Sequence, residues 1–199
     1  MNVKLLPLVQ QQFGLQLIET NSPLVEPRPS STSSGRRSLV EQGVKLVFPN
    51  SNERTRSEFI VAQVMIGIAL AHPVSYFSGY PFEVDPALGL VGECDYLFSH
   101  SSLTFRIHPP VVMIVEVKRD LGRCLPHCLV ELAAAQQFNG SDDPIYGVLT
   151  TGLEWQFLKL EGANTSGAGN LCVTVESTIY KVESLARIES ILAAMVSEP

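Results

Sequence analysis

The chain has 199 residues, of which 45% are hydrophobic and 17% are charged, so it is long enough to bury one sizeable core. Fourteen basic and twenty acidic side chains give a formal net charge of −6, which argues against a protein that coats itself in nucleic acid through bulk charge. The four cysteines form no CxxC pair, which predicts reduced thiols and a cytoplasmic protein. The sequence has no apolar run of membrane-spanning length, so we expect no membrane partner.

The first part of the chain is expected to be an extension of the main domain. Residues 1–20 suffice for one short element, and residues 21–37 are rich in Pro, Ser and Gly, which is typical of a linker. We therefore expect an N-terminal extension over 1–38 and a single domain over 39–199. A short strand is predicted within 39–49.

A long helix is predicted next, over residues 51–72. Ser51 or Asn52 suits the N-cap position, and Pro73 follows the expected end. The segment from Phe59 to Leu70 is apolar almost all the way round, so this helix should be heavily buried.

The rest of the chain alternates strands and helices. A second helix is expected over 125–139, with Pro126 in its opening turn and Gly140 just past its end. The last helix should cover Trp155 and Phe157. We predict an α/β protein with a central mixed sheet flanked by helices, whose strands lie in 74–84, 89–100, 111–119, 145–152, 154–160 and 171–177, and whose last helix lies in 181–196.

The strand at 111–119 carries charges at its end, although it is otherwise apolar. Because side chains alternate along a strand, Glu116 and Lys118 should share a face with Val112 and Ile114. Charged side chains are rarely buried without a partner or a task. This pair therefore marks a candidate functional site.

Two more carboxylates lie in apolar surroundings. Glu58 opens the apolar part of the first long helix, and Asp95 lies in the strand-like GECDY of residues 92–96. Carboxylate oxygens from two adjacent strands and a covering helix are suitable ligands for a hard divalent cation. Lys118 beside them could orient water or offset the charge of a phosphate group.

The order of these residues resembles the PD-(D/E)XK nuclease superfamily. The resemblance covers residues 51–160 and rests on Glu58, the GECDY segment with Asp95, and VEVK at 115–118, followed by a helix. It implies a restriction-endonuclease-like αβββαβ core and phosphodiester hydrolysis in nucleic acid. It further implies that Asp95, Glu116 and the Val117 carbonyl hold Mg²⁺ or Mn²⁺, that Lys118 positions water, and that Glu58 supports the site.

The sequence departs from the family pattern at two places. Cys94 stands where the name-giving proline would precede Asp95. The glutamine common on the second helix would correspond to Gln136 or Gln137, but these lie near the end of that helix. We therefore prefer His127, nearer its start and on the same face as Glu131, as the contributing polar residue.

Four arginines flank the predicted site, namely Arg54, Arg56, Arg119 and Arg123. Gathered at one rim they would grip a phosphate backbone, while scattered they would be ordinary solvated charges. The expected partner is nucleic acid, with DNA placed before RNA. A homodimer is expected where two strands are cut.

Three alternatives stay open. A relative that keeps the fold but not the chemistry would act as a binding or regulatory module. If the resemblance is accidental, the carboxylates of Glu58, Asp95 and Glu116 should not converge. A metal site at Cys124, His127 and Cys128 has only three local ligands, and a half-buried helix start explains these residues better.

Overall fold

The computed structural model describes residues 5–29, 34–101, 105–162 and 170–197. Most of the predicted turn at 161–170 therefore lies outside the described residues. Among the described helices, none combines the length and the apolar character needed to cross a membrane.

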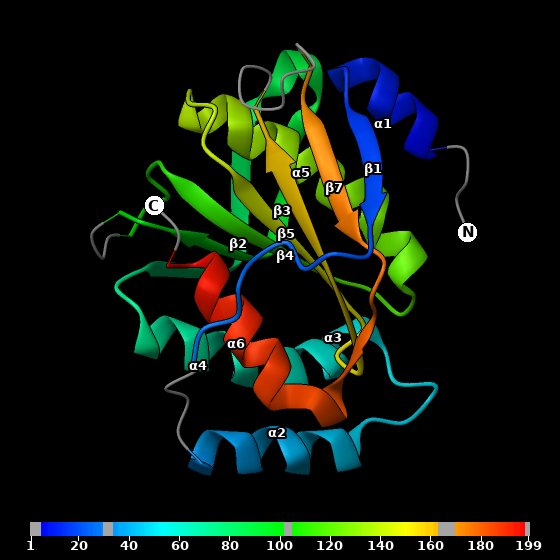
Figure 1. The fold of residues 1–199 in the computed structure, drawn as a ribbon, viewed down its shortest axis with the longest axis vertical. Coiled ribbons are helices and arrows are strands. Elements are labelled where there is room, and N and C mark those ends of the chain that lie inside the picture. Colours follow the sequence, from blue (N-terminus) through cyan, green and yellow to red (C-terminus); the bar gives the residue numbers. More distant parts are fainter. Residues whose placement is uncertain (1–4, 30–33, 102–104, 163–169, 198–199) are drawn as a thin grey trace.

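One mixed sheet forms the centre of the described structure (Figure 1), as the sequence predicts. Its strands follow the spatial order β1-β7-β6-β5-β4-β3-β2, and β8 pairs with β6. Pairing is parallel between β1 and β7 and between β4 and β5, and antiparallel elsewhere. The strands are β1 (Gln16–Thr20), β2 (Ser75–Asp85), β3 (Leu90–Ser99), β4 (Val111–Val117), β5 (Ile145–Thr150), β6 (Glu154–Glu161), β7 (Cys172–Glu176) and β8 (Tyr180–Lys181).

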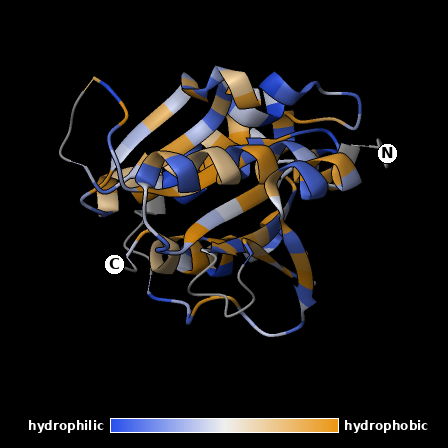
Figure 2. Ribbon diagram, turned by 90° about the horizontal axis from the view of Figure 1, so that it is seen from above, coloured by the Kyte–Doolittle hydropathy of each residue, from blue (hydrophilic) through white to orange (hydrophobic). Residues whose placement is uncertain are grey.

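Helices cover both faces of the sheet. Helices α1 and α5 pack on one face, α4 and α6 pack on the other, and α2 lies outside α4. Hydrophobic residues follow the strands and the helix surfaces between these layers (Figure 2). The helices are α1 (Leu5–Phe13), α2 (Ser34–Leu46), α3 (Glu53–Arg56), the π-helix η1 (Ser57–Val61), α4 (Ala62–Ala71), α5 (Leu121–Asn139) and α6 (Leu185–Met195), with short 3₁₀ turns η2 (Pro86–Leu88) and η3 (Val182–Ser184).

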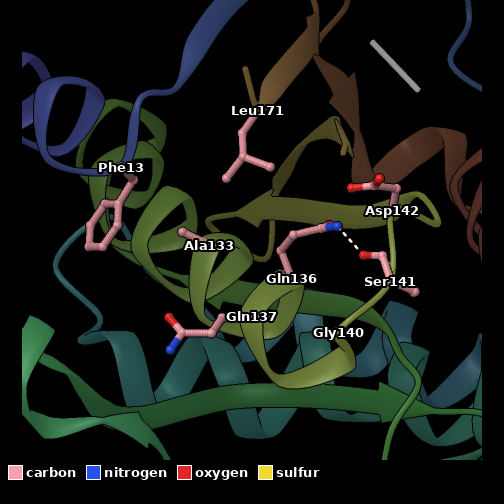
Figure 3. A pocket seen from close by; sticks show the side chains of 8 residues that line it. All are labelled: Phe13, Ala133, Gln136, Gln137, Gly140, Ser141, Asp142 and Leu171. Atoms are coloured by element: carbon pink, nitrogen blue, oxygen red, sulfur yellow. Dashed lines mark hydrogen bonds between the residues drawn. The ribbon is translucent and has the colours of Figure 1, made fainter. Parts of the chain in front are cut away.

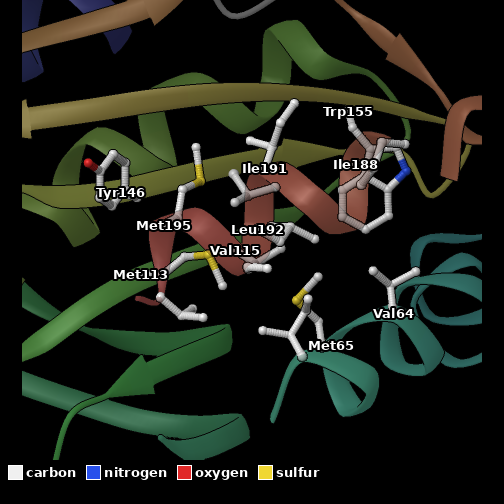
Figure 4. Packing of buried hydrophobic residues seen from close by; sticks show 14 of the residues in the cluster. Val64, Met65, Met113, Val115, Tyr146, Trp155, Ile188, Ile191, Leu192 and Met195 are labelled. Atoms are coloured by element: carbon white, nitrogen blue, oxygen red, sulfur yellow. The ribbon is translucent and has the colours of Figure 1, made fainter. Parts of the chain in front are cut away.

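The core under α6 confirms the expected burial of the aromatic residues of β6. Trp155 and Phe157 are fully buried there, and Figure 4 shows Trp155 beside Ile188 of α6. The indole Nε1 donates a hydrogen bond of 3.1 Å to the Gly152 carbonyl, so its polar atom is satisfied inside the core.

The N-terminal residues belong to the body of the fold. This differs from the expected N-terminal extension over 1–38. Strand β1 pairs in parallel with β7 at the edge of the sheet, and Leu15 is buried in the core beneath α1. The predicted strand within 39–49 is also wrong, because helix α2 continues to Leu46. This helix packs Val40 into the core and leaves Leu39 and Leu46 exposed.

The long helix predicted over 51–72 is present as α3, η1 and α4. Asn52 caps it by accepting a hydrogen bond from the Thr55 amide, and His72 ends it in an extended conformation before Pro73. The π-helical turn in the middle was not predicted. Gly43 of α2 packs so closely against this turn that an added Cβ would lie 2.0 Å from the Phe59 carbonyl oxygen.

Helix α5 begins one turn earlier than the sequence suggests. It starts at Leu121, so Pro126 lies inside it rather than in its opening turn. The additional turn brings Cys124 to complete burial, which accounts for the earlier start.

Candidate functional site

The candidate site lies where β3 and β4 part. Their backbone pairing ends at Tyr96 and Val115, and Asp95 is the next residue of β3 on the unpaired side. Beyond that point the Asp95 carboxylate takes the place of a backbone partner, because its Oδ2 accepts a hydrogen bond of 2.8 Å from the Val117 amide. The side chain of Asp95 is thereby fixed at the end of β4.

Lys118 joins the two strand carboxylates. Its ammonium forms an ion pair with Glu116 and lies 3.8 Å from Oδ2 of Asp95. It also donates to the Val117 carbonyl at 3.3 Å, while the Lys118 amide donates to the Thr150 carbonyl of β5 at 3.1 Å. The structure therefore brings Asp95, Glu116, Val117 and Lys118 together.

Burial sets the electrostatics of this cluster. Glu116 is only 3% exposed, and burial, followed by the nearby charge of Asp95, raises the pKa of its carboxyl to about 7. Burial alone would lower the pKa of Lys118, but its ion pair with Glu116 and the charge of Asp95 raise it overall. Lys118 is consequently a cation that is held between the carboxylates of Glu116 and Asp95.

The face of the sheet that carries Glu116 also carries Ile114, as alternation along the strand predicts. The expected alternation fails at the start of β4, where Val111 lies on this face and Val112 lies on the other. The register between β3 and β4 shifts there, which exchanges the two side chains.

A cavity of about 410 Å³ opens on this face beneath α5, and we call it the carboxylate cavity. Asp95, Glu116 and Lys118 line it from the sheet, and His127 and Glu131 line it from α5. Partial burial, followed by the charge of Lys118, lowers the pKa of His127. The placement agrees with the preference for His127.

Glu131 was not predicted as a site residue. Burial, followed by the charges of Glu116 and Asp95, raises the pKa of its carboxyl well above the usual range. The Cys94 thiol donates a hydrogen bond to this carboxyl, but its Oε2 is buried without a hydrogen-bond partner in the described part of the chain. Its spacing of four residues from His127 was the available signal, since i and i+4 share a helix face.

Glu58 faces a different cavity. It lies with Asp95 and Val117 around a space of about 580 Å³ on the α4 side, and it forms an ion pair of 2.8 Å with Arg54. Glu58 and Glu116 therefore line different cavities, and Asp95 lines both. Over the described ranges, no three Asp, Glu, His or Cys side chains are grouped so as to hold one metal ion.

The four arginines do not form one rim. Arg56 is buried and donates to the carbonyls of Ser51 and Thr151 at 3.3 and 3.1 Å, so it ties the first long helix to the β5–β6 turn. This corrects its expected contact with nucleic acid. Arg54, Arg119 and Arg123 are exposed, and the last two follow Lys118 closely along the chain.

Gln136 and Gln137 lie away from the carboxylates, as expected. They line a separate hollow of about 370 Å³ at the end of α5 (Figure 3). The Gln136 amide group donates to the Ser141 carbonyl. These glutamines therefore do not contact the carboxylate cluster.

The cysteines of α5 are core residues. Cys124 and Cys128 are fully buried, and burial raises the pKa of both thiols. His127 between them is exposed instead, so the three side chains do not face one point.

Comparison with known proteins gives no family assignment. No protein-family model matches the chain, and no curated protein matches it significantly.

Proposed function

We propose that the protein is a metal-dependent phosphodiester hydrolase that acts on nucleic acid, with DNA preferred to RNA as the substrate. The observation that carries this proposal is the cluster of Asp95, Glu116 and Lys118 at the point where β3 and β4 part. Two carboxylates and one fixed ammonium beside an open cavity are groups that can act on a phosphate ester.

The arrangement of the elements supports this proposal. A helix precedes the antiparallel strands β2, β3 and β4, then α5 crosses over, and β5 returns parallel to β4. This order supports the proposal, because the resemblance implies a core of the type αβββαβ. Asp95 lies on β3, Glu116 lies on β4 and Lys118 directly follows β4, which also supports it.

The donors in this cluster suit a hard cation. Carboxylate oxygens of Asp95 and Glu116 and the carbonyl oxygen of Val117 are the ligand types that Mg²⁺ and Mn²⁺ prefer. When bound, the cation would act as a Lewis acid and stabilise negative charge on the phosphate oxygens. The pair of carboxylates, held against each other with one ammonium between them, has negative charge left to balance.

The chain's own residues then have distinct roles. Lys118 fixes the two carboxylates and presents a positive charge to the phosphate group. The ring of His127, which lines the carboxylate cavity, can accept or pass on a proton. Arg119 and Arg123 are exposed, follow Lys118 closely along the chain, and would suit contacts with neighbouring phosphates. Glu58 would act only from the α4 side of Asp95.

Calorimetric titration with Mn²⁺ tests the metal site directly. We expect the wild type and the exposed-carboxylate control Glu19→Ala to bind Mn²⁺, and the double variant Asp95→Ala, Glu116→Ala to lose binding. Lys118→Ala should retain Mn²⁺ binding but lose at least about 100-fold in hydrolysis of DNA, because it removes the positive charge that meets the phosphate.

A wild type that binds no Mn²⁺, even with a phosphodiester ligand present, would contradict the proposal. The chain would then be better explained as a binding or regulatory module with the same fold. That alternative has support in the described residues, where the third carboxylate, Glu58, lines a different cavity from Glu116 and forms an ion pair with Arg54.

Two further expectations concern the cellular compartment and the oligomeric state. The four cysteines are free and buried, which suits a reducing compartment such as the cytoplasm. Cutting both strands of a duplex would require two sites, and hence a homodimer, whereas one site suffices for a single strand.

A further inference from the structure

The carboxylate cavity is lined by more acidic than basic side chains. Its walls carry the carboxyl groups of Glu93, Asp95, Glu116 and Glu131, and the ammonium group of Lys118. This ammonium is already engaged, because it forms an ion pair with Glu116 and lies 3.8 Å from Oδ2 of Asp95. The occupant that this distribution of charge favours is therefore a cation.

Glu131 reaches the cavity from a different layer of the fold. It lines the cavity from α5, whereas Asp95 and Glu116 line it from β3 and β4. Burial raises the pKa of the Glu131 carboxyl, and the charges of Glu116 and Asp95 are the next causes of this shift. The three carboxyl groups thus lie close enough for their charges to act on one another.

The two oxygens of the Glu131 carboxyl have different surroundings. One accepts a hydrogen bond from the Cys94 thiol, which holds the side chain in place. The other, Oε2, is buried and has no hydrogen-bond partner among the described residues. A buried polar atom without a partner costs free energy, so Oε2 is suited to accept a hydrogen bond from a bound ligand.

Glu131 can contribute to a cation site without contacting the ion. The described residues do not group three carboxylates around one ion. Mg²⁺, however, keeps several of its water molecules when it binds to proteins. Groups that accept hydrogen bonds around the ligands of a metal ion raise its affinity, although they do not touch the ion. Oε2 of Glu131 is a free acceptor of this kind.

We propose that Glu131 is a positioning residue that completes the cation site from α5. Its Oε2 accepts a hydrogen bond from the hydration water of a divalent cation held by Asp95 and Glu116, and the Cys94 thiol orients it. This inference rests on the proposed function, because it adds a residue to the same site. With the charges of these carboxylates balanced, the cavity can accept a phosphate group.

Calorimetric titration of Glu131→Gln with Mn²⁺ tests this role. Glutamine has nearly the same shape and keeps an oxygen for the Cys94 thiol, but it carries no charge. We expect the Kd for Mn²⁺ to rise about tenfold or more, as is usual when a partner around the metal ligands is lost. The thermal midpoint of the metal-free variant should not fall, because the buried position is still filled.

Glu93→Gln is the matched control. Glu93 lines the same cavity, but its side chain is exposed. Water screens an exposed charge, so this variant should bind Mn²⁺ within about twofold of the wild type. Glu131→Asp and Glu131→Asn form a second pair, equal in size and different in charge. The aspartate variant should bind Mn²⁺ more tightly than the asparagine variant, which separates charge from packing when both have lower thermal midpoints.

The results distinguish this inference from the proposed function. Wild-type affinity for Mn²⁺ in Glu131→Gln, or equal affinities in the aspartate and asparagine variants, would overturn the inference and leave the hydrolase. Weaker binding by Glu131→Gln, with no hydrolysis of DNA by the wild type, would support the role of Glu131 and contradict the hydrolase. A wild type that binds no Mn²⁺ would overturn both.

Discussion

Two carboxylates share a single ammonium at the end of β4. Lys118 cannot neutralise both Asp95 and Glu116, and Glu116 has lost almost all contact with water. The remaining negative charge is therefore relieved by a proton on Glu116 at neutral pH or by a bound cation. Glu131, close by on α5, responds to the same surroundings, because burial, followed by the charges of Glu116 and Asp95, raises the pKa of its carboxyl.

The pH dependence of stability should show the proton on Glu116. Its folded-state pKa is about 7, above the ordinary value of 4.5, so the folded protein binds more protons than the unfolded chain between these values. This contribution to the free energy of unfolding is fully present below pH 4.5 and is lost as the pH rises through 7. Urea unfolding of the metal-free protein at pH 5 and pH 8 should show a loss on the order of 3 kcal/mol.

Glu116→Gln provides the comparison, since glutamine has a similar shape and does not titrate. Its free energy of unfolding should change less between pH 5 and pH 8 than that of the wild type. An identical pH dependence in both proteins would show that Glu116 keeps its ordinary pKa.

At the scale of elements, the close contact of α2 with η1 decides the position of Glu58. The π-helical turn lies in the helix that carries Glu58, and the backbone of α2 reaches it through Gly43. Any larger residue at position 43 would push the two helices apart. π-helical turns occur often at functional sites, and this one faces the cavity that Glu58 shares with Asp95.

We expect Gly43→Ala to lower the free energy of unfolding by about 1–3 kcal/mol, because a Cβ 2.0 Å from the Phe59 carbonyl oxygen forces a displacement. Gly35→Ala, on the same helix, has no atom within 4 Å of its new Cβ. It should stabilise the protein slightly, since alanine is the better helix former. Equal effects of the two substitutions in thermal unfolding would contradict this account.

Sequence patterns predicted the elements best where they depend on local periodicity. Alternation placed Glu116 and Ile114 on one face, and the apolar run from Phe59 to Leu70 predicted a buried helix. Contacts distant in the sequence were not predictable in this way. Arg56 was taken for a surface cation because its carbonyl partner at Thr151 lies 95 residues away, and nothing local distinguishes it from Arg54.

At the scale of the whole molecule, the N-terminal segment belongs to the fold and also lines the carboxylate cavity. Helix α1 packs on α5, and β1 extends the sheet beyond β7. A short segment that mixes apolar residues with glutamines, followed by a linker-like stretch, gave no local sign of these contacts. The elements that they contact, α5 and β7, lie far from them along the chain.

Leu15→Ala measures how much this segment contributes. Leu15 is 6% exposed in the core between α1 and the sheet, so its truncation should lower the free energy of unfolding by about 2–5 kcal/mol. Leu8→Ala, at a position that is 60% exposed, should have almost no effect. If both substitutions were neutral in urea unfolding, residues 5–20 would be an appendage after all.

The pairing of β1 with β7 also has a consequence for biosynthesis. Gln16 pairs with Cys172, so the two strands come from opposite ends of the chain. Strand β1 leaves the ribosome well before β7 and must therefore wait for it before their ladder can form, and such distant contacts form slowly. Until then, the apolar side chain of Leu15 has no place in the core. A nascent chain in that state is a natural client for a chaperone.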